Sequence, residues 1–155
     1  MRHRAAQISF STIIIIGVII GLALTVEAVS FIKNRDADFC RRALYYLVKG
    51  RPAAEKMIDW NQLKAVGLDT GKEYSGLPND NERKMFRKVF INSFAAGFLK
   101  VKGEFKKFVH WRVIDRKSDF IIVAADYKKT GDTLLFALPK KGKKKIQSIQ
   151  WKEKE

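Results

Sequence analysis

The hydrophobic pattern sets residues 8–32 apart from the rest of the chain. This segment, ISFSTIIIIGVIIGLALTVEAVSFI, contains one charged residue, Glu27. A helix of about 20 apolar residues crosses the hydrocarbon core of a bilayer, and an isolated span must be helical because lipid offers its backbone no hydrogen bonds. The pattern therefore predicts a basic tail over 1–7, a single-pass transmembrane helix over 8–32 and one domain over 33–155.

A cleaved secretory signal is the alternative interpretation of the same segment. Arg2 and Arg4 precede the apolar run, and Val26-Glu27-Ala28 is an acceptable cleavage site. The apolar part of a signal peptide spans roughly 7 to 15 residues, however, and this run is longer. The length favours a retained signal anchor.

Small residues lie on one face of the predicted span, where they would let a second helix approach closely. The set comprises Gly17, Gly21, Thr25 and Ala28. We expect this face to pack against a protein partner or a second copy of the chain.

The period of the pattern becomes helical after residue 33. Residues 36–49 place apolar side chains, Cys40 among them, at helical spacing, and a second helix is predicted over 53–63. Residues 67–78 are rich in turn formers and predict a loop. Asn79 with Glu82 then forms a capping box for a third helix, whose inward stripe is expected to be Phe86, Val89, Phe90, Ser93, Phe94 and Gly97.

The period changes to two after Gly103. Apolar and polar residues alternate over 104–114, and further strands are predicted over 119–127, 133–139 and 146–152, with short turns between them. Helices followed by strands indicate an α+β domain rather than alternating α/β. The expected fold is a transmembrane helix followed by helices packed on a curved, four-stranded antiparallel sheet.

Composition limits the chemistry that the chain supports. Cys40 is the single cysteine, so no intrachain disulfide forms, and His3 and His110 are the only histidines. No metal-binding spacing is present, and neither a metal nor another cofactor is expected. The net charge of +15 falls almost wholly in residues 33–155, which predicts affinity for polyanions. Because no aromatic residues are interleaved with the lysine run, nucleic acid is a poor candidate, and anionic lipid headgroups are the expected partner.

The stretches IDWNQL (58–63) and ERKMFRKVFINSFAAGF (82–98), in this order of elements, resemble small bacterial envelope proteins of the nuclear transport factor 2-like superfamily, which has a cystatin-like cone. They are also similar to the periplasmic phospholipid-shuttle family known for toluene tolerance. The resemblance implies a sheet curved around a helix, with a pocket at its open end. It also implies a bacterial inner-membrane protein with a periplasmic domain, although the basic residues on both sides of the span leave a cytoplasmic orientation open.

Two candidate sites follow from these patterns. An anionic surface contact is expected at the lysine run of the last hairpin, namely Lys140, Lys141, Lys143, Lys144 and Lys145. An apolar pocket is expected among the large aromatic residues Trp60, Phe90, Phe94, Phe98 and Trp111.

The expected function is a non-catalytic, membrane-anchored binding or assembly module, an accessory subunit of a larger membrane complex. A carrier of a lipid or other apolar ligand is one alternative, and it needs a cavity. A small isomerase- or dehydratase-like enzyme is the other, and it needs an acid or histidine inside that cavity. Asp126 could be that acid only if the side of its strand that carries Phe120, Ile122 and Ala124 faces the core. The alternation over 104–114 places His110 on the solvent-facing side with Lys106 and Arg112.

Overall fold

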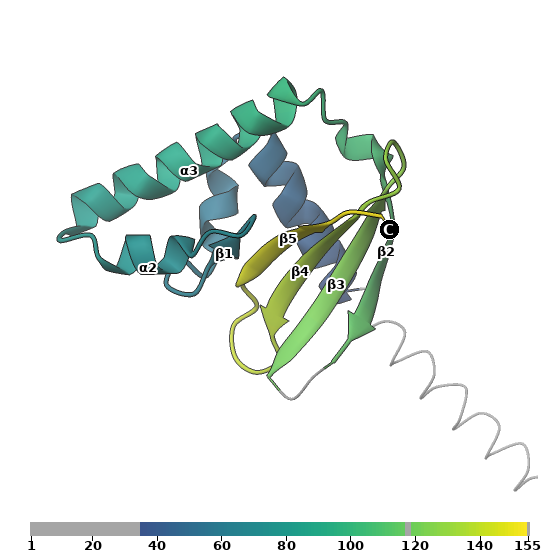
Figure 1. Ribbon diagram of the computed structural model, residues 1–155. Helices are drawn as coiled ribbons and strands as arrows, with labels where there is room; N and C mark the ends of the chain where they lie inside the picture. The colour runs from purple at the N-terminus through teal and green to yellow at the C-terminus, as the bar shows by residue number, and fades with distance from the viewer. Residues whose placement is uncertain (1–34, 117–118, 155) are drawn as a thin grey trace, which may run out of the picture. The chain divides into compact units, whose positions relative to one another are not determined.

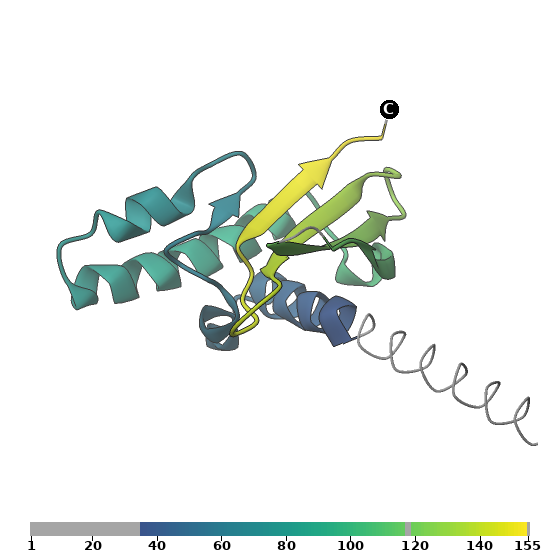
Figure 2. The ribbon, with the colours of Figure 1, turned by 90° about the horizontal axis from the view of Figure 1, so that it is seen from below.

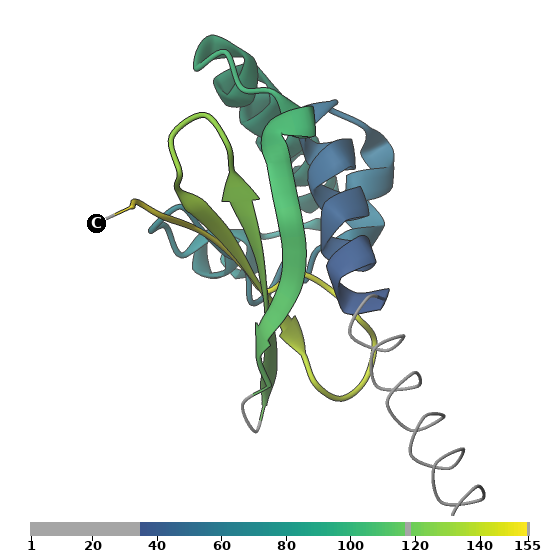
Figure 3. The same ribbon diagram turned by 90° about the vertical axis from the view of Figure 1, so that its right-hand side faces the viewer.

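The first described helix covers one face of a β-sheet. The computed structural model describes residues 35–116 and 119–154, and residues 35–48 are helical. The helix buries the face predicted from its spacing, which is Cys40, Ala43, Leu44, Leu47 and Val48, and it buries Ala37 as well. Figure 3 shows it lying along the sheet. Gly50, with a φ of 61°, turns the chain after the helix ends.

The sheet has five strands in the order β1-β5-β4-β3-β2. They are β1 (Lys64–Ala65), β2 (Phe108–Asp115), β3 (Phe120–Tyr127), β4 (Thr133–Pro139) and β5 (Ser148–Lys152). Strands β2 to β5 are antiparallel neighbours, whereas β1 pairs with β5 in parallel. Cross-strand pairs such as Val123 with Phe136, and Phe136 with Ile149, place the core on the face that the 35–48 helix covers.

The predicted four-stranded antiparallel sheet is therefore wrong in strand number and type. The missing strand, β1, is two residues long, and two residues carry no readable period. Strand β1 lies before α2 in the chain. It occupies the free edge of β5 and runs in the same direction as β5, so the pair is parallel. Figure 2 shows β1 beside β5.

The transmembrane helix predicted over 8–32, together with its packing face at Gly17, Gly21, Thr25 and Ala28, lies outside the described residues. Within the described residues, no helix is long and apolar enough to cross a membrane. The longest of them, α3, is interrupted by charged residues. The structure thus does not show the anchored architecture that the sequence predicted.

The segment between the 35–48 helix and β2 differs most from expectation. The predicted helix over 53–63 is only a 3₁₀-helix, η1 (Pro52–Met57), and the predicted loop over 67–78 contains the helix α2 (Thr70–Ser75). Helix α3 (Asp80–Lys100) starts where predicted. Asn79 Oδ1 accepts from the Glu82 N–H at 3.0 Å, and Asn79 Nδ2 donates to Glu82 Oε1 at 3.1 Å, which confirms the capping box.

Helix α3 buries little of its own surface. It begins beside α2 and ends near the start of β2 (Figure 1), and Ile91 is its one buried residue. Phe86, Phe90, Phe94 and Phe98 are only partly buried, and Val89 is exposed. The inward stripe predicted from the sequence thus lies mostly at a surface rather than in the core.

Candidate functional site

An apolar groove lies between the C-terminal half of α3 and the sheet. Its volume is about 580 Å³. Helix α3 contributes Ser93, Phe94, Gly97 and Phe98 to one wall. The rest of the lining comes from the 35–48 helix, the turn after β1, the segment after α3, four strands of the sheet and the turn between β3 and β4: Leu44, Val66, Val101, Gly103, Phe108, Tyr127, Thr130, Leu134, Ile149 and Trp151.

Aromatic rings line one end of the groove. Phe108 lies against Tyr127 with ring centroids 4.7 Å apart, and its ring also lies 6.1 Å from Trp151. Phe98 stacks on Phe108 from the helix side at 6.2 Å. These rings leave an apolar wall that adapts little, because aromatic side chains pack as rigid units.

Hydrogen bonds fix the polar edges of these rings. The Tyr127 hydroxyl accepts from the Glu104 N–H at 3.3 Å, and the Trp151 indole N–H donates to Asp132 Oδ2 at 3.1 Å. The Thr130 hydroxyl, followed by the Lys154 N–H, holds the pKa of Asp132 below its usual value. Asp132 therefore stays ionised near neutral pH and keeps the Trp151 ring oriented at the groove edge.

The predicted aromatic pocket separates into three places. Phe94 and Phe98 line the groove. Trp60 and Phe90 instead pack edge to face at 5.5 Å in a second cluster near α2, where the Trp60 indole donates to the Glu55 carbonyl at 2.9 Å. Trp111 stacks on the buried ring of Phe136. The sequence pattern did not distinguish residues of a groove wall from residues that pack elsewhere.

No acid or histidine lines this groove in the described part of the chain. Asp126 lies on the opposite face of the sheet, because β3 turns Ile121, Val123 and Ala125 toward the helix. There it pairs with Arg112 at 2.8 Å and with His110 at 3.2 Å. The hydrogen bond from Arg112 is the largest influence that lowers the pKa of Asp126, so this carboxylate is an ionised surface group.

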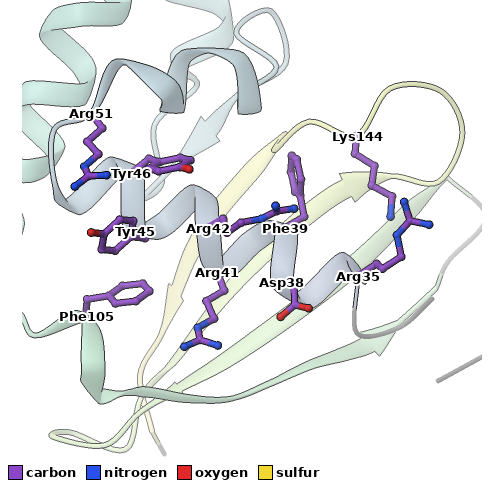
Figure 4. A pocket seen from close by; sticks show the side chains of 10 residues that line it. All are labelled: Arg35, Asp38, Phe39, Arg41, Arg42, Tyr45, Tyr46, Arg51, Phe105 and Lys144. Atoms are coloured by element: carbon purple, nitrogen blue, oxygen red, sulfur yellow. The ribbon is translucent and has the colours of Figure 1, made fainter. Parts of the chain in front are cut away.

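The predicted lysine contact lies at a second site. Lys144 pairs with Asp36, a carboxylate only 1% exposed, which also accepts from Arg116 Nη2 at 2.9 Å. This pairing brings the 140–145 loop to the start of the described helix. Beside it lies a groove of about 640 Å³ whose lining includes Arg35, Arg41, Arg42, Arg51 and Lys144 (Figure 4). The helical spacing of Arg35, Arg41 and Arg42 is the sequence signal that could have indicated this basic groove.

Cys40 is a packing residue. It is fully buried, and burial, followed by the nearby Asp36 charge, raises the pKa of its thiol. The thiol therefore stays protonated and unreactive at neutral pH. Within the described residues, no cluster of histidine, cysteine, aspartate or glutamate could hold a metal ion.

Backbone strain marks the rim of the apolar groove. Val66, which lines it, has a φ of 49°. A β-branched residue in the left-handed region costs on the order of 1 to 3 kcal/mol. Its side chain is nevertheless 65% exposed, so packing does not offset that cost. Such strain concentrates at binding sites, where the side chain serves something other than stability.

We expect Val66→Gly to stabilise the protein by about 1 kcal/mol, because relief of strain exceeds the added entropy of the unfolded glycine. Thermal unfolding should then occur about 3 °C higher. Val101→Gly is the matched control, since it removes the same side chain from a more exposed groove position with an ordinary φ of −84°. Equal effects of the two substitutions in calorimetry would contradict strain at Val66.

Comparison with known proteins gives no relative for this chain. No protein-family model, no curated protein and no solved structure matches it. The resemblance to the nuclear transport factor 2-like superfamily therefore stays a prediction.

Proposed function

We propose that this protein is a non-catalytic assembly module that holds an apolar segment of a partner protein in the groove between α3 and the sheet. The observation that carries the proposal is the groove itself, whose polar side chains are confined to Ser93, Thr130 and the hydrogen-bonded Tyr127 in the described lining. The free energy falls when an apolar group displaces water from an apolar groove.

Exposed apolar side chains beyond the groove favour a protein as the occupant. Met85, Val89 and Leu99 on α3 are all more than half exposed and do not line the groove. A small ligand enclosed in a cavity would leave these side chains in water.

The charge around the groove indicates the composition of the partner. Lys100 and Lys102 flank Val101, and Lys152 follows Trp151, and all three lysines are exposed. A partner segment with acidic residues beside its apolar ones complements this rim. Complementary rim charges speed association and set specificity more than they add affinity.

Gly97→Leu tests the proposal because it fills the groove without a clash. A Cβ at Gly97 meets nothing within 4 Å, and the position lines the groove. Replacement of a helical glycine should also stabilise the helix by up to about 1 kcal/mol. We therefore expect a variant at least as stable as the natural chain that no longer forms its complex.

Ala96→Leu is the matched control, because it adds leucine to the neighbouring exposed position, outside the groove lining. The full-length chain and both variants are purified under mild conditions, and the mass and composition of each complex are determined. A defined complex kept by Ala96→Leu and lost by Gly97→Leu supports the proposal. A complex that survives Gly97→Leu refutes it.

Carriage of a lipid or other apolar ligand is the second candidate, favoured by the nearly unbroken apolar lining. It makes a different prediction for the same preparations. The purified chain would then carry a stoichiometric apolar molecule and no protein, and Gly97→Leu would release that molecule. The enzyme alternative needs an acid or histidine inside the groove, and the described lining holds neither, since Asp126 and His110 pair on the other face of the sheet.

A further inference from the structure

Basic residues distant in the sequence form one surface at the 35–48 helix. Arg35, Arg41, Arg42 and Lys49 are exposed on the helix, and Arg51 follows it. The 140–145 loop adds exposed lysines at the other end, held there by the ion pair between Lys144 and the buried Asp36. We define this set as the basic face: Arg35, Arg41, Arg42, Lys49, Arg51, Lys140, Lys141, Lys143, Lys144 and Lys145.

Aromatic rings lie between the cations of the basic face. Figure 4 shows Tyr45 and Tyr46 beside Arg51, with the Phe105 ring facing Tyr45. The Tyr45 and Phe105 centroids are 5.3 Å apart, and the Arg51 guanidinium lies 5.1 Å from the Tyr45 ring centre. Arginine next to half-buried tyrosine is the composition that favours the polar boundary of a bilayer.

Two arginines of the basic face carry charge that no described acid neutralises. Arg41 and Arg42 have no ion-pair partner among the described residues, and the nearest exposed acid in the groove lining is Asp38. The face is also an extended helix surface rather than a cage around one anion. Many dispersed phosphates match it better than a single soluble phosphate.

We propose that the basic face binds the surface of anionic phospholipid, through contacts of its arginines and lysines with headgroup phosphates and carboxylates. This site lies apart from the apolar groove and does not depend on the function proposed for that groove. Each basic residue near an anionic surface contributes about 1 kcal/mol, so the contact is strong only when several act together.

A polarity-sensitive fluorophore on the basic face reads this contact directly. Asp38→Cys in the full-length chain provides an exposed attachment point, whereas Cys40 is fully buried and unreactive. The labelled chain is mixed with vesicles of phosphatidylcholine, with or without phosphatidylserine. We expect the emission to shift to shorter wavelength only with phosphatidylserine, and added salt to reverse the shift because it screens exposed charges.

The triple variant Arg41→Ser, Arg42→Ser, Lys49→Ser should need at least about tenfold more anionic lipid for the half-maximal shift. Lys84→Ser, Lys88→Ser, Lys100→Ser is the matched control, since it removes the same charge from exposed positions on α3. Both are compared by circular dichroism to establish that they fold.

Four outcomes overturn the proposal: an equal shift with neutral vesicles, no shift with either, an equal loss in both triple variants, or displacement by inorganic phosphate at low concentration. The third would mean that net charge alone drives binding. The fourth would assign the face to a soluble phosphate compound. A shift specific to phosphatidylserine and to the basic face supports it.

Discussion

Replacement of Gly71 with alanine is expected to lower the free energy of unfolding by about 3 kcal/mol. A Cβ at this position would lie 2.5 Å from the Asn61 carbonyl oxygen and 2.8 Å from its carbon. Both are backbone atoms, so no side-chain rotation relieves the overlap. The clash is resolved only if α2 moves away from residues 61–63.

That movement would break well-made contacts. The Gly71 N–H donates to the Leu63 carbonyl at 2.8 Å, and Leu63 is fully buried beneath the turn. Tyr74, one turn further along α2, packs on Trp60 with ring centroids 5.9 Å apart. Separation would cost a buried hydrogen bond and uncover this apolar surface, and these losses account for the expected magnitude.

Gly76→Ala, at the residue that caps the C-terminal end of α2, is the control. A Cβ at Gly76 makes ordinary contacts at 3.5 Å, and its φ is −76°. This substitution should be neutral or stabilise the protein by up to about 1 kcal/mol, because it restricts the unfolded chain. Urea unfolding of both variants measures the difference, and similar free energies would show that α2 is not held against residues 61–63.

The sequence predicted the elements whose signals are local. The spacing of apolar residues in the 35–48 helix gave its buried face, and the Asn79–Glu82 capping box gave the start of α3. Alternating or largely apolar runs between turn signals indicated the positions of β2 to β5, although the strand predicted over 104–114 begins only at Phe108, after a 3₁₀ turn over Phe105–Lys107. In each case, the side chains that form the element lie next to one another in the sequence.

Features that depend on distant residues escaped prediction. Strand β1 exists because Lys64 and Ala65 find the free edge of β5, and nothing within two residues reports that edge. Helix α2 forms in a glycine-containing segment because Asp69 caps it, its side chain accepting from the Lys72 N–H at 3.1 Å. The groove could be predicted only if the separation of α3 from the sheet were known. The phenylalanine stripe of α3 does not indicate that separation.

The burial of Asp36 also depends on distant residues and could not be predicted from the sequence. The sequence marks it only as an acid in a predicted helix, with no sign that it is buried. Its partners Arg116 and Lys144 come from the end of β2 and from the β4–β5 loop, far along the chain. A buried carboxylate needs such partners, because an unpaired charge inside a protein is strongly unfavourable.

Replacement of Asp36 with alanine is expected to lower the free energy of unfolding by about 2 to 3 kcal/mol. Removal of one partner from a fully buried ion pair costs about 3 to 5 kcal/mol. Here the side chains of Arg116 and Lys144 are 31% and 39% exposed, so both cations can turn toward water, which reduces the cost. Asp38→Ala, at an exposed position of the same helix, should change stability by less than about 0.5 kcal/mol.

The same substitution tests how the basic face is held together. Loss of Asp36 removes the ion pair that holds Lys144 of the 140–145 loop at the helix, so the loop lysines should bind anionic vesicles less cooperatively with the helix arginines. The double variant Asp36→Ala, Lys144→Met separates the two effects, because it removes both charges at once. It should recover part of the lost stability but none of the vesicle affinity. Full additivity of the two single changes in urea unfolding would mean that Asp36 and Lys144 do not interact, and that the lysine loop reaches the helix by other contacts.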